Sequence, residues 1–278
     1  MKVSVIIPVY NEEADIAECL ESLGAQKFED FEIIVVDDGS SDNTKKAISE
    51  IKSFIDMVFL SQSHKGPAAA RNLGAKKARG RVLVFVDADM EFDKHFLQKL
   101  TQPIFDGKTF GTFTKEEYVK NIAYPWAKSW GMNEGWEKGR RHPAHYPDKQ
   151  KVFRAILKKE FVKAGGFDSG GYTDDYSLSD KLGYMADNAP GAKVYHKNPD
   201  NLQEVFYQAK WAAKRHYKFG LLGIILSMAR ALALPFSPGT WYKAVNSKEP
   251  RFIIFRLIYG IGIFLGILEY YVFHKGLK

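Results

Sequence analysis

The sequence predicts an α/β fold in which helices flank a mostly parallel sheet, followed by hydrophobic, membrane-associated helices at the C-terminus. Apolar runs rich in β-branched residues recur through residues 1–100, which is typical of strands buried on both faces. Segments with apolar residues at helical spacing separate these runs. This alternation indicates right-handed βαβ units and a parallel sheet. Two long apolar stretches near the end of the chain account for the C-terminal helices.

The regular alternation lies in residues 1–100. The expected strands are Val3–Val9, Phe31–Val36, Met57–Leu60 and Val82–Val86. The expected helices are Ala14–Gln26, a helix capped by Ser41 or Asp42, and a helix that opens at Gly66. Cys19 falls on the inward face of the first helix, so we expect it to be buried.

Residues 101–200 are less regular. The expected strands are Phe110–Val119, Val152–Leu157 and Lys193–His196. Helical structure is expected over Pro125–Lys138, Glu160–Gly166 and Ser177–Ala186. Two loops are expected between these elements, the basic segment Arg140–Lys151 and the polar segment Phe167–Tyr176.

The last part of the chain is apolar and basic. Leu202–Phe219 is expected to form a basic amphipathic helix. Gly220–Phe236 has one charge, Arg230, near its centre, and we expect it to pack on the domain or lie in a membrane plane. Phe252–Phe273 is long enough to span a bilayer, and we expect it to span or to insert deeply. The alternative for Phe252–Phe273 is an amphipathic helix that packs on the domain or lies in the membrane plane, and the alternative for Gly220–Phe236 is a spanning helix.

The charge is unevenly distributed. Residues 1–100 carry 13 Lys and Arg against 17 Asp and Glu, a net charge of −4, so the remainder of the +7 chain carries +11. A basic second half favours an anionic partner, and its cations lie beside apolar helices, which suits phospholipid better than nucleic acid. The single Cys19 excludes an internal disulfide and fits a reducing compartment. No secretory signal is recognisable at the N-terminus.

Two carboxylates follow the fourth expected strand directly. Asp87 and Asp89 come after the buried run Val82–Val86, with only Ala88 between them. Ligands of open α/β sheets bind outside the carboxyl ends of the strands. A pair of this kind can hold Mg²⁺ or Mn²⁺ together with phosphate oxygens, although a solvated acidic turn would give the same pattern.

Four stretches, VSVIIPVYNEE, EIIVVDDGSSDNT, GPAAARNLGAKKARG and VLVFVDADM, stand in the order and spacing of a known family. Together with the later GGFDSGGYTDDYSLSDKLG they resemble the family 2 glycosyltransferases, which transfer sugars from nucleoside-diphosphate sugars and have the Rossmann-like GT-A fold. The resemblance implies a catalytic domain over residues 1–200, with a nucleotide-sugar half (1–100) and an acceptor half (101–200). Residues 201–278 would form the membrane-associated part.

The resemblance also implies roles for the acidic residues after the fourth strand. Asp89 is the expected ligand of a divalent cation, Mn²⁺ or Mg²⁺, and Asp87 contacts ribose, or the metal through water. Glu91 is either a third oxygen ligand or a helix-capping acid. His196 is either an extra metal ligand or a packed loop histidine.

The nucleotide site follows from the other motifs by the same resemblance. Pro8, Tyr10 and Glu12 match the family's base-binding edge, and the ring of Tyr10 would face the nucleobase. Asp38 matches the carboxylate that accepts from the base, and Arg71 is placed to reach the diphosphate or ribose. Asp175 is the candidate general base for the acceptor hydroxyl, with Asp174 as the alternative.

These expectations define a metal-dependent inverting glycosyltransferase attached to the cell membrane, with its catalytic domain on the cytoplasmic side. The lysines and arginines beside the apolar segments support that orientation. The acceptor would be lipid-linked, a polyprenyl phosphate or a glycolipid, or otherwise a polysaccharide. A membrane-tethered nucleotide-sugar-binding protein without transfer activity is the non-enzymatic alternative. A sugar-phosphate nucleotidyltransferase would need a glycine-rich loop where this chain has PVYNEE.

Overall fold

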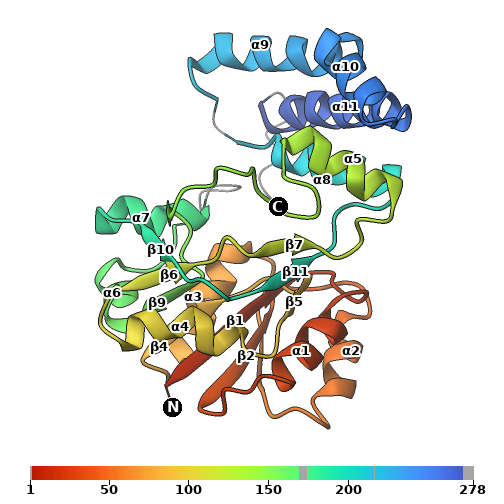
Figure 1. Cartoon of the computed structure of the whole chain (residues 1–278). Helices are drawn as coiled ribbons and strands as arrows, with labels where there is room; N and C mark the ends of the chain where they lie inside the picture. The colour runs from red at the N-terminus through yellow and green to blue at the C-terminus, as the bar shows by residue number, and fades with distance from the viewer. Residues whose placement is uncertain (1, 169–173, 216, 272–278) are drawn as a thin grey trace. The chain divides into compact units, whose positions relative to one another are not determined.

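The computed structural model describes residues 2–168, 174–215 and 217–271 (Figure 1). The chain forms two compact units. Unit 1 comprises residues 1–118 and 145–196, and unit 2 comprises residues 119–144 and 197–278. Residues 119–144 therefore leave unit 1 and pack with the C-terminal part of the chain.

Unit 1 is built on an eight-stranded sheet in the order β3-β2-β1-β4-β9-β6-β10-β8. Its strands are β1 (Val3–Val9), β2 (Phe31–Asp37), β3 (Val58–Ser61), β4 (Val82–Phe85), β6 (Gly111–Phe113), β8 (Lys149–Gln150), β9 (Ala155–Leu157) and β10 (Ala186–Asn188). β1 pairs in parallel with β2 and β4, and β2 pairs in parallel with β3. β9 is antiparallel to both β4 and β6. The mostly parallel α/β fold expected from the sequence is confirmed.

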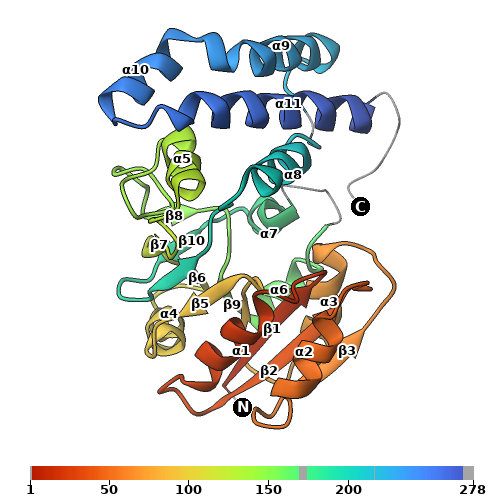
Figure 2. The same cartoon turned by 90° about the vertical axis from the view of Figure 1, so that its right-hand side faces the viewer.

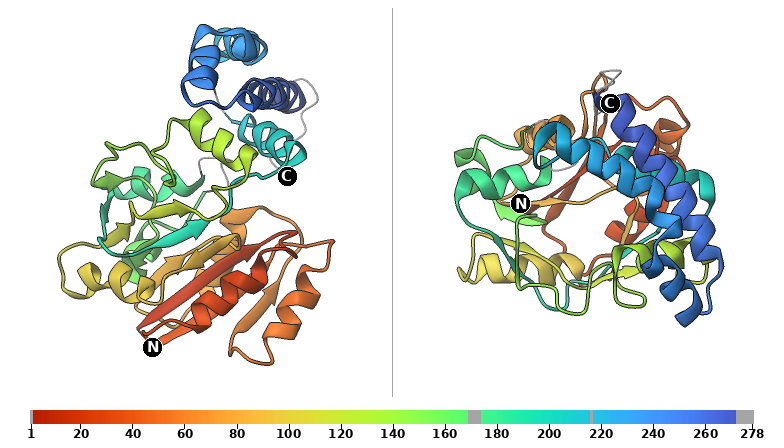
Figure 3. Two further views of the ribbon diagram at one scale, coloured as in Figure 1. Left: turned by 45° about the vertical axis from the view of Figure 1, so that its right-hand side comes forward. Right: turned by 90° about the horizontal axis from the view of Figure 1, so that it is seen from above.

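Helices cover both faces of this sheet. The helices of unit 1 are α1 (Ile16–Gly24), α2 (Thr44–Ile51), α3 (Pro67–Lys77), α4 (Phe96–Phe105), α6 (Lys158–Lys163) and α7 (Ser177–Leu182), with the 3₁₀ turn η1 (Asp174–Tyr176). One buried cluster joins the sheet to α1, α2 and α4, and a second joins it to α3, α6 and α7 (Figures 2 and 3). Cys19 lies in the first cluster and is fully buried, as expected.

The strand order places a topological switch point beside β1. The chain runs from β1 outward to β2 and β3, and then returns to the opposite side of β1 as β4. Loops at the carboxyl ends of β1 and β4 therefore diverge in opposite directions and leave a crevice, which is where α/β sheets bind ligands. Tyr10 follows β1 at this edge, and Asp87 follows β4.

A second, three-stranded sheet has the order β5-β11-β7. It consists of β5 (Met90–Phe92), β11 (Val194–His196) and β7 (Glu117–Val119). The single strand expected over Phe110–Val119 is therefore wrong, because the segment divides into β6 in the first sheet and β7 in the second. Met90 and Glu91, which follow the carboxylate pair, belong to β5.

Several element ends also differ from the sequence expectation. The helix expected over Ser177–Ala186 ends at Leu182, because Gly183 adopts a left-handed conformation (φ 75°) that terminates it, and Ala186 starts β10. The helix expected to reach Lys138 ends before Gly135 for the same reason. The helix α4 and the short strand β8 had no expected counterpart.

Unit 2 is helical. Its elements are α5 (Pro125–Glu134), α8 (Leu202–Ala212), α9 (Gly220–Ala233), the 3₁₀ turn η2 (Leu234–Phe236), α10 (Pro238–Asn246) and α11 (Arg251–Tyr271). α11 packs against α5, α8, α9 and α10. The amphipathic helix expected over Leu202–Phe219 is shorter in the structure, where α8 ends at Ala212. By length and hydropathy, residues 220–246 and 251–271 are candidate membrane segments within the described part of the chain.

Candidate active site

Asp87 lies at the centre of a network of alternating charges. Arg71 Nη2 donates to Asp87 Oδ1 at 2.9 Å, and Arg154 Nη1 donates to Asp87 Oδ2 at 3.0 Å. Arg154 Nη2 also lies 3.6 Å from Glu117 Oε1. Burial alone would raise the pKa of Asp87, but Arg154 and Arg71 hold it well below its usual range. Asp87 therefore stays ionised at neutral pH, and it holds two guanidinium groups in place at the end of β4.

Asp175 joins the same network through Arg71. Arg71 Nη1 donates to Asp175 Oδ1 at 2.5 Å, so this one side chain, only 7% exposed, links the end of β4 to η1. Its guanidinium also lies 5.7 Å from the centre of the Phe167 ring. Asp174 starts η1, while Thr173 and the preceding glycines lie outside the described residues. The structure thus brings together Arg71, Asp87 and Asp175 from three separate sequence motifs.

His196 reaches the carboxylates through strand pairing. β11 pairs antiparallel with β5 so that His196 stands opposite Met90, the residue after Asp89. His196 Nδ1 lies 3.7 Å from Asp89 Oδ2. His196 is 4% exposed, and neither ring nitrogen has a hydrogen-bond partner among the described residues. A buried imidazole without partners is costly unless a ligand engages it.

The pair Asp89 and His196 fits a divalent cation. Carboxylate oxygen and neutral imidazole nitrogen are both suitable ligands, and Mg²⁺ or Mn²⁺ commonly takes only one or two protein ligands alongside phosphate oxygens. No group of three or more His, Cys, Asp or Glu side chains arranged for metal binding occurs in the described residues. The two side chains are therefore suited to a cation whose other ligands come from a bound diphosphate. They are too few to coordinate a cation by protein groups alone.

Glu12, in the loop after β1, lies near the carboxylate of Asp89. Burial raises the pKa of Glu12 to about 8, and the nearby carboxylates Asp89, Asp15 and Asp87 act in the same direction. Glu12 is held there by its backbone N–H, which donates to Thr44 Oγ1 at 2.8 Å. Glu12 is therefore largely protonated at neutral pH, because burial and the neighbouring carboxylates disfavour its charged form.

Asp38 organises the loop between β3 and α3. Its carboxylate accepts from Gln62 Nε2 at 2.6 Å and from the backbone N–H groups of Lys65 and Gly66 at 2.9 and 2.8 Å. His64 Nδ1 lies 2.9 Å from Asp38 Oδ2. Asp38 thus holds the start of α3, which carries Arg71, in addition to any contact it makes with a ligand.

An aromatic platform lies at the end of β1. The rings of Tyr10 and His64 stack with their centres 3.9 Å apart and an interplanar angle of 23°. Tyr10 is 43% exposed. A flat, partly exposed aromatic surface beside Asp38 is suited to stacking against a planar heterocycle.

The remaining expected residues lie around this crevice. Pro8 is in β1 opposite Val36 of β2, and Glu91 is in β5 opposite Tyr195 of β11. Glu91 is thus a strand residue and does not cap a helix.

Sequence reasoning missed Arg154, Glu117 and His64. Arg154 is the only charged residue in the apolar run VFRAIL, and a lone arginine inside a buried strand signals a fixed anionic partner. Glu117 and His64 carry no comparable signal, because only the β6–β7 break and the Asp38 contacts bring them to the crevice.

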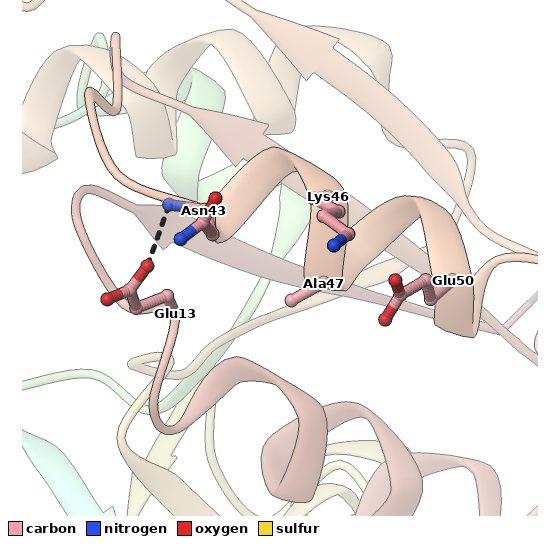
Figure 4. A pocket seen from close by; sticks show the side chains of 5 residues that line it. All are labelled: Glu13, Asn43, Lys46, Ala47 and Glu50. Atoms are coloured by element: carbon pink, nitrogen blue, oxygen red, sulfur yellow. Dashed lines mark hydrogen bonds between the residues drawn. The ribbon is translucent and has the colours of Figure 1, made fainter.

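A surface hollow on unit 1 is separate from these residues. It is lined by Glu13, Asn43, Lys46, Ala47 and Glu50, at the start of α2 (Figure 4). Glu13 Oε2 accepts from the backbone N–H of Asn43 at 2.8 Å there. The hollow includes none of the residues of the charged network, so we do not assign it to the active site.

The family model described as glycosyl transferase family 2 matches residues 4–161. The GalNAc(5)-diNAcBac-PP-undecaprenol beta-1,3-glucosyltransferase of Campylobacter jejuni is 37% identical over 109 residues, which cover 38% of this chain and 35% of that protein. The chain spans between 14% and 36% of the length of eight curated glycosyltransferase relatives.

Two solved structures share the fold. TarS residues 1–349 of S. aureus, in complex with UDP-GlcNAc, has a TM-score of 0.60 at 17% identity, covering 99% of this chain and 93% of that one. The mannosyltransferase PcManGT of Pyrobaculum calidifontis, in complex with GDP-Man and Mn²⁺, has a TM-score of 0.58 at 19% identity, covering 99% and 88%.

Proposed function

The chain belongs to glycosyl transferase family 2, and from this premise we propose that it transfers a sugar from a nucleoside-diphosphate sugar to an acceptor, with inversion at the anomeric carbon. The observation that carries the proposal is the convergence of Arg71, Asp87 and Asp175 beside the pair Asp89 and His196. Cations, a metal-binding pair and a carboxylate base are the groups that this reaction needs at one crevice.

The donor would lie across the carboxyl ends of β1, β2 and β4. The Tyr10–His64 platform and Asp38 would receive the nucleobase, with Pro8 and Glu12 forming the edge of the site. Arg71 and Arg154, fixed by Asp87, would face the diphosphate. The complexes of TarS with UDP-GlcNAc and of PcManGT with GDP-Man support a donor of this class.

Asp89 and His196 would hold a divalent cation, and Glu91 is a possible further ligand from β5. When bound, the cation stabilises the negative charge that develops on the departing diphosphate. Mn²⁺ in the PcManGT complex supports this assignment. Asp87 has both oxygens engaged by arginines, so we propose that it positions Arg71 and Arg154 and contacts the metal only indirectly.

Asp175 would act as the general base. A single displacement forms a bond between the acceptor oxygen and the anomeric carbon while the bond to the diphosphate breaks, and the nucleoside diphosphate leaves with the electron pair. The acceptor's proton passes to Asp175, which Arg71 holds at the edge of the crevice. Asp174 is the alternative base, and an acceptor that is already a phosphate would need neither.

We propose a lipid-linked acceptor, consistent with the undecaprenol-linked substrate in the name of the Campylobacter relative. Unit 1 would supply the chemistry, and unit 2, which includes residues 119–144 as well as the C-terminal helices, would attach the enzyme to the cell membrane. We propose that the catalytic domain lies on the cytoplasmic side, where nucleotide sugars are made, and the single buried thiol of Cys19 is compatible with that reducing environment.

The test is a transfer assay with UDP-, GDP- and dTDP-sugars, Mn²⁺ and a polyprenyl phosphate, measuring release of nucleoside diphosphate and formation of lipid-linked sugar. Asp89→Ala should abolish transfer and also remove the Mn²⁺-dependent increase in melting temperature that nucleotide gives. Asp106→Ala is the control, because Asp106 is an exposed carboxylate at the end of α4. Asp89→Ala with wild-type turnover would refute the metal site, and binding of every donor without turnover would favour a non-transferring binding protein.

A further inference from the structure

On α9 the usual distribution of side chains on a surface helix is reversed, because large apolar side chains are exposed. α9 buries the small residues Gly223 and Ala231, and the large apolar side chains point away from the protein. Five of these are between 49% and 72% exposed: Leu221, Leu222, Ile225, Leu226 and Leu232. Helices on water-facing surfaces place large apolar residues inward and polar residues outward. The outward side of α9 is therefore suited to an apolar environment.

The same reversal continues through η2 and α10. α10 buries Thr240 and Ala244 and exposes an aromatic and aliphatic face. The exposed residues of this stretch include Phe236 (77%), Trp241 (50%), Tyr242 (69%) and Val245 (75%). Tryptophan and tyrosine are enriched where a protein meets the boundary between lipid headgroups and acyl chains. We call the exposed apolar residues of α9, η2 and α10 the outer apolar face.

The segment that carries the outer apolar face has charges of one sign. Residues 205–248 contain seven lysines and arginines and no aspartate or glutamate. Five of the cations are exposed: Arg215, Lys218, Arg230, Lys243 and Lys248. An apolar surface whose own segment carries cations and no acidic residue is complementary to a bilayer containing anionic phospholipid, where each cation near the surface adds to binding. A second copy of the same surface would bring like charges together.

The packing of unit 2 argues against a bilayer-crossing arrangement. α9 has 14 residues, about 21 Å at 1.5 Å per residue, which is shorter than the hydrocarbon core of about 30 Å. The apolar stretch then breaks at Pro235 and Pro238. α9 and α10 are therefore two short helices and not one spanning helix.

α11 is long enough to cross, but α8 lies along it. Gly262 and Gly266 of α11 leave no room for a side chain against the backbone of α8. Lys210 of α8 and Lys214, just after the helix, pair with Glu269 at 2.7 and 3.4 Å. α8 exposes Gln203, Glu204 and Gln208 on its other side. A bilayer-crossing α11 would carry these polar groups into hydrocarbon, which is costly.

We propose that unit 2 binds the surface of an anionic phospholipid bilayer through the outer apolar face, with α9 and α10 lying in the membrane plane and no segment of the described chain crossing. Figure 2 shows α9 and α10 on one side of α11, and α5 and α8 on its other side. α11 thus separates the membrane-facing layer from the water-facing helices. The inference concerns unit 2 alone and does not depend on the proposed transfer reaction.

The test measures the depth of single positions in the full chain. Cys19→Ala removes the only native thiol, and an environment-sensitive probe is then attached at Leu222→Cys, Leu232→Cys or Val245→Cys in separate variants. With phosphatidylcholine vesicles containing phosphatidylglycerol, quenchers at known depth should place all three probes at one shallow level, about 5–10 Å below the headgroups. A depth that increases along the helix, or a probe reached from the opposite leaflet, would establish a spanning arrangement and overturn the proposal.

A binding measurement with matched variants gives a second readout. Leu222→Ser with Leu226→Ser should weaken vesicle binding by about tenfold or more, whereas Phe54→Ser should not, although Phe54 is 89% exposed in unit 1. Omitting phosphatidylglycerol should also weaken binding. Probes that stay in water while light scattering reports a dimer would assign the outer apolar face to self-association instead.

Discussion

Asp87 and Asp89 are separated by one residue, yet their surroundings give them different tasks. Asp87 faces Arg71 and Arg154, which occupy both of its oxygens. Asp89 instead faces His196, a buried imidazole without hydrogen-bond partners in the described chain. The carboxylate of Asp87 thus orients two arginine side chains. The carboxylate of Asp89 lies beside His196, where the two side chains could bind one metal ion.

Asp175→Asn tests the proposed proton acceptor. The amide keeps the shape of the side chain but cannot take the acceptor's proton, so turnover should fall by roughly 10²–10⁴-fold with little change in donor affinity. Asp180→Asn is the matched control, because Asp180 is a largely exposed carboxylate of α7 that pairs with Lys151 at 2.6 Å. Steady-state kinetics would contradict the base role if turnover stayed unchanged, and would move Asp175 into the donor site if donor binding were lost instead.

Glu32 makes a pH-dependent contribution to stability. Burial alone would raise its pKa, but hydrogen bonds from Ser4 Oγ (2.7 Å) and from Arg79 hold that pKa below its ordinary value. A carboxyl with a lowered folded-state pKa stabilises the protein above its unfolded pKa, and the effect disappears as the pH falls through the folded-state pKa.

The variant Glu32→Gln should therefore lower the free energy of unfolding by about 1 kcal/mol at neutral pH. The difference from the wild type should shrink as the pH falls below about 4.5. Urea unfolding across pH measures it, with the exposed Glu29→Gln as control. A difference that is constant across pH would refute this account.

At the scale of elements, close packing of α3 on the sheet sets the position of Arg71. Gly74 lies one turn after Arg71, and a Cβ there would lie 2.5 Å from Ile6 Cγ2 and 3.3 Å from Val36 Cγ2. Glycine thus lets α3 approach β1 and β2 closely enough for Arg71 to reach both Asp87 and Asp175.

Gly74→Ala should destabilise the protein by about 1–3 kcal/mol, because overpacking outweighs the better helix propensity of alanine. It should also lower turnover by displacing Arg71. Gly131→Ala in α5 is the matched control, since the nearest atom to its added Cβ is Trp136 Cε3 at 3.9 Å. That variant should stabilise by about 0.5–1 kcal/mol in urea unfolding. Equal effects of the two substitutions would show that packing on the sheet is not decisive.

At the scale of the whole molecule, the two units interleave along the chain. Residues 119–144 belong to unit 2, where Trp130 meets Phe255 and Tyr259 of α11 at ring-centre distances of 6.1 and 5.7 Å. A division of the chain at residue 200 would separate these partners. The apolar helix α11 is therefore also the helix on which the other helices of unit 2 pack.

A chain that ends at Phe236 should consequently be less soluble than the full chain, although it lacks an apolar helix. Without α11, Trp130 and the apolar face of α8 become exposed to solvent. Binding of a hydrophobic dye and aggregation should therefore increase. Size-exclusion chromatography in mild detergent measures this, and a chain that ends at Tyr271 is the control. If chain 1–236 were monomeric and did not bind the dye, α11 would not be needed for the packing of unit 2.

The sequence determined the parallel half of the sheet and the position of the carboxylates within it. Buried strands such as Val3–Val9 and Val82–Phe85 are continuous apolar runs, and polar residues follow them directly, so local pattern places Asp38, Asp87 and Asp89 at one edge. The motifs around these residues also predicted the family. Each of these features depends on residues close together in the chain.

Tertiary structure alone decided which partner each of these groups meets. Arg154 reaches Asp87 because β9 runs antiparallel beside β4. His196 reaches Asp89, 107 residues earlier in the chain, because β11 pairs with β5. Short strands of three residues carry little periodicity, and their register is fixed by pairing with strands elsewhere in the chain. The proposed mode of membrane contact also rests on tertiary structure. Phe252–Tyr271 is equally apolar whether lipid or α8 lies beside it, and only the packing against α8 distinguishes the two.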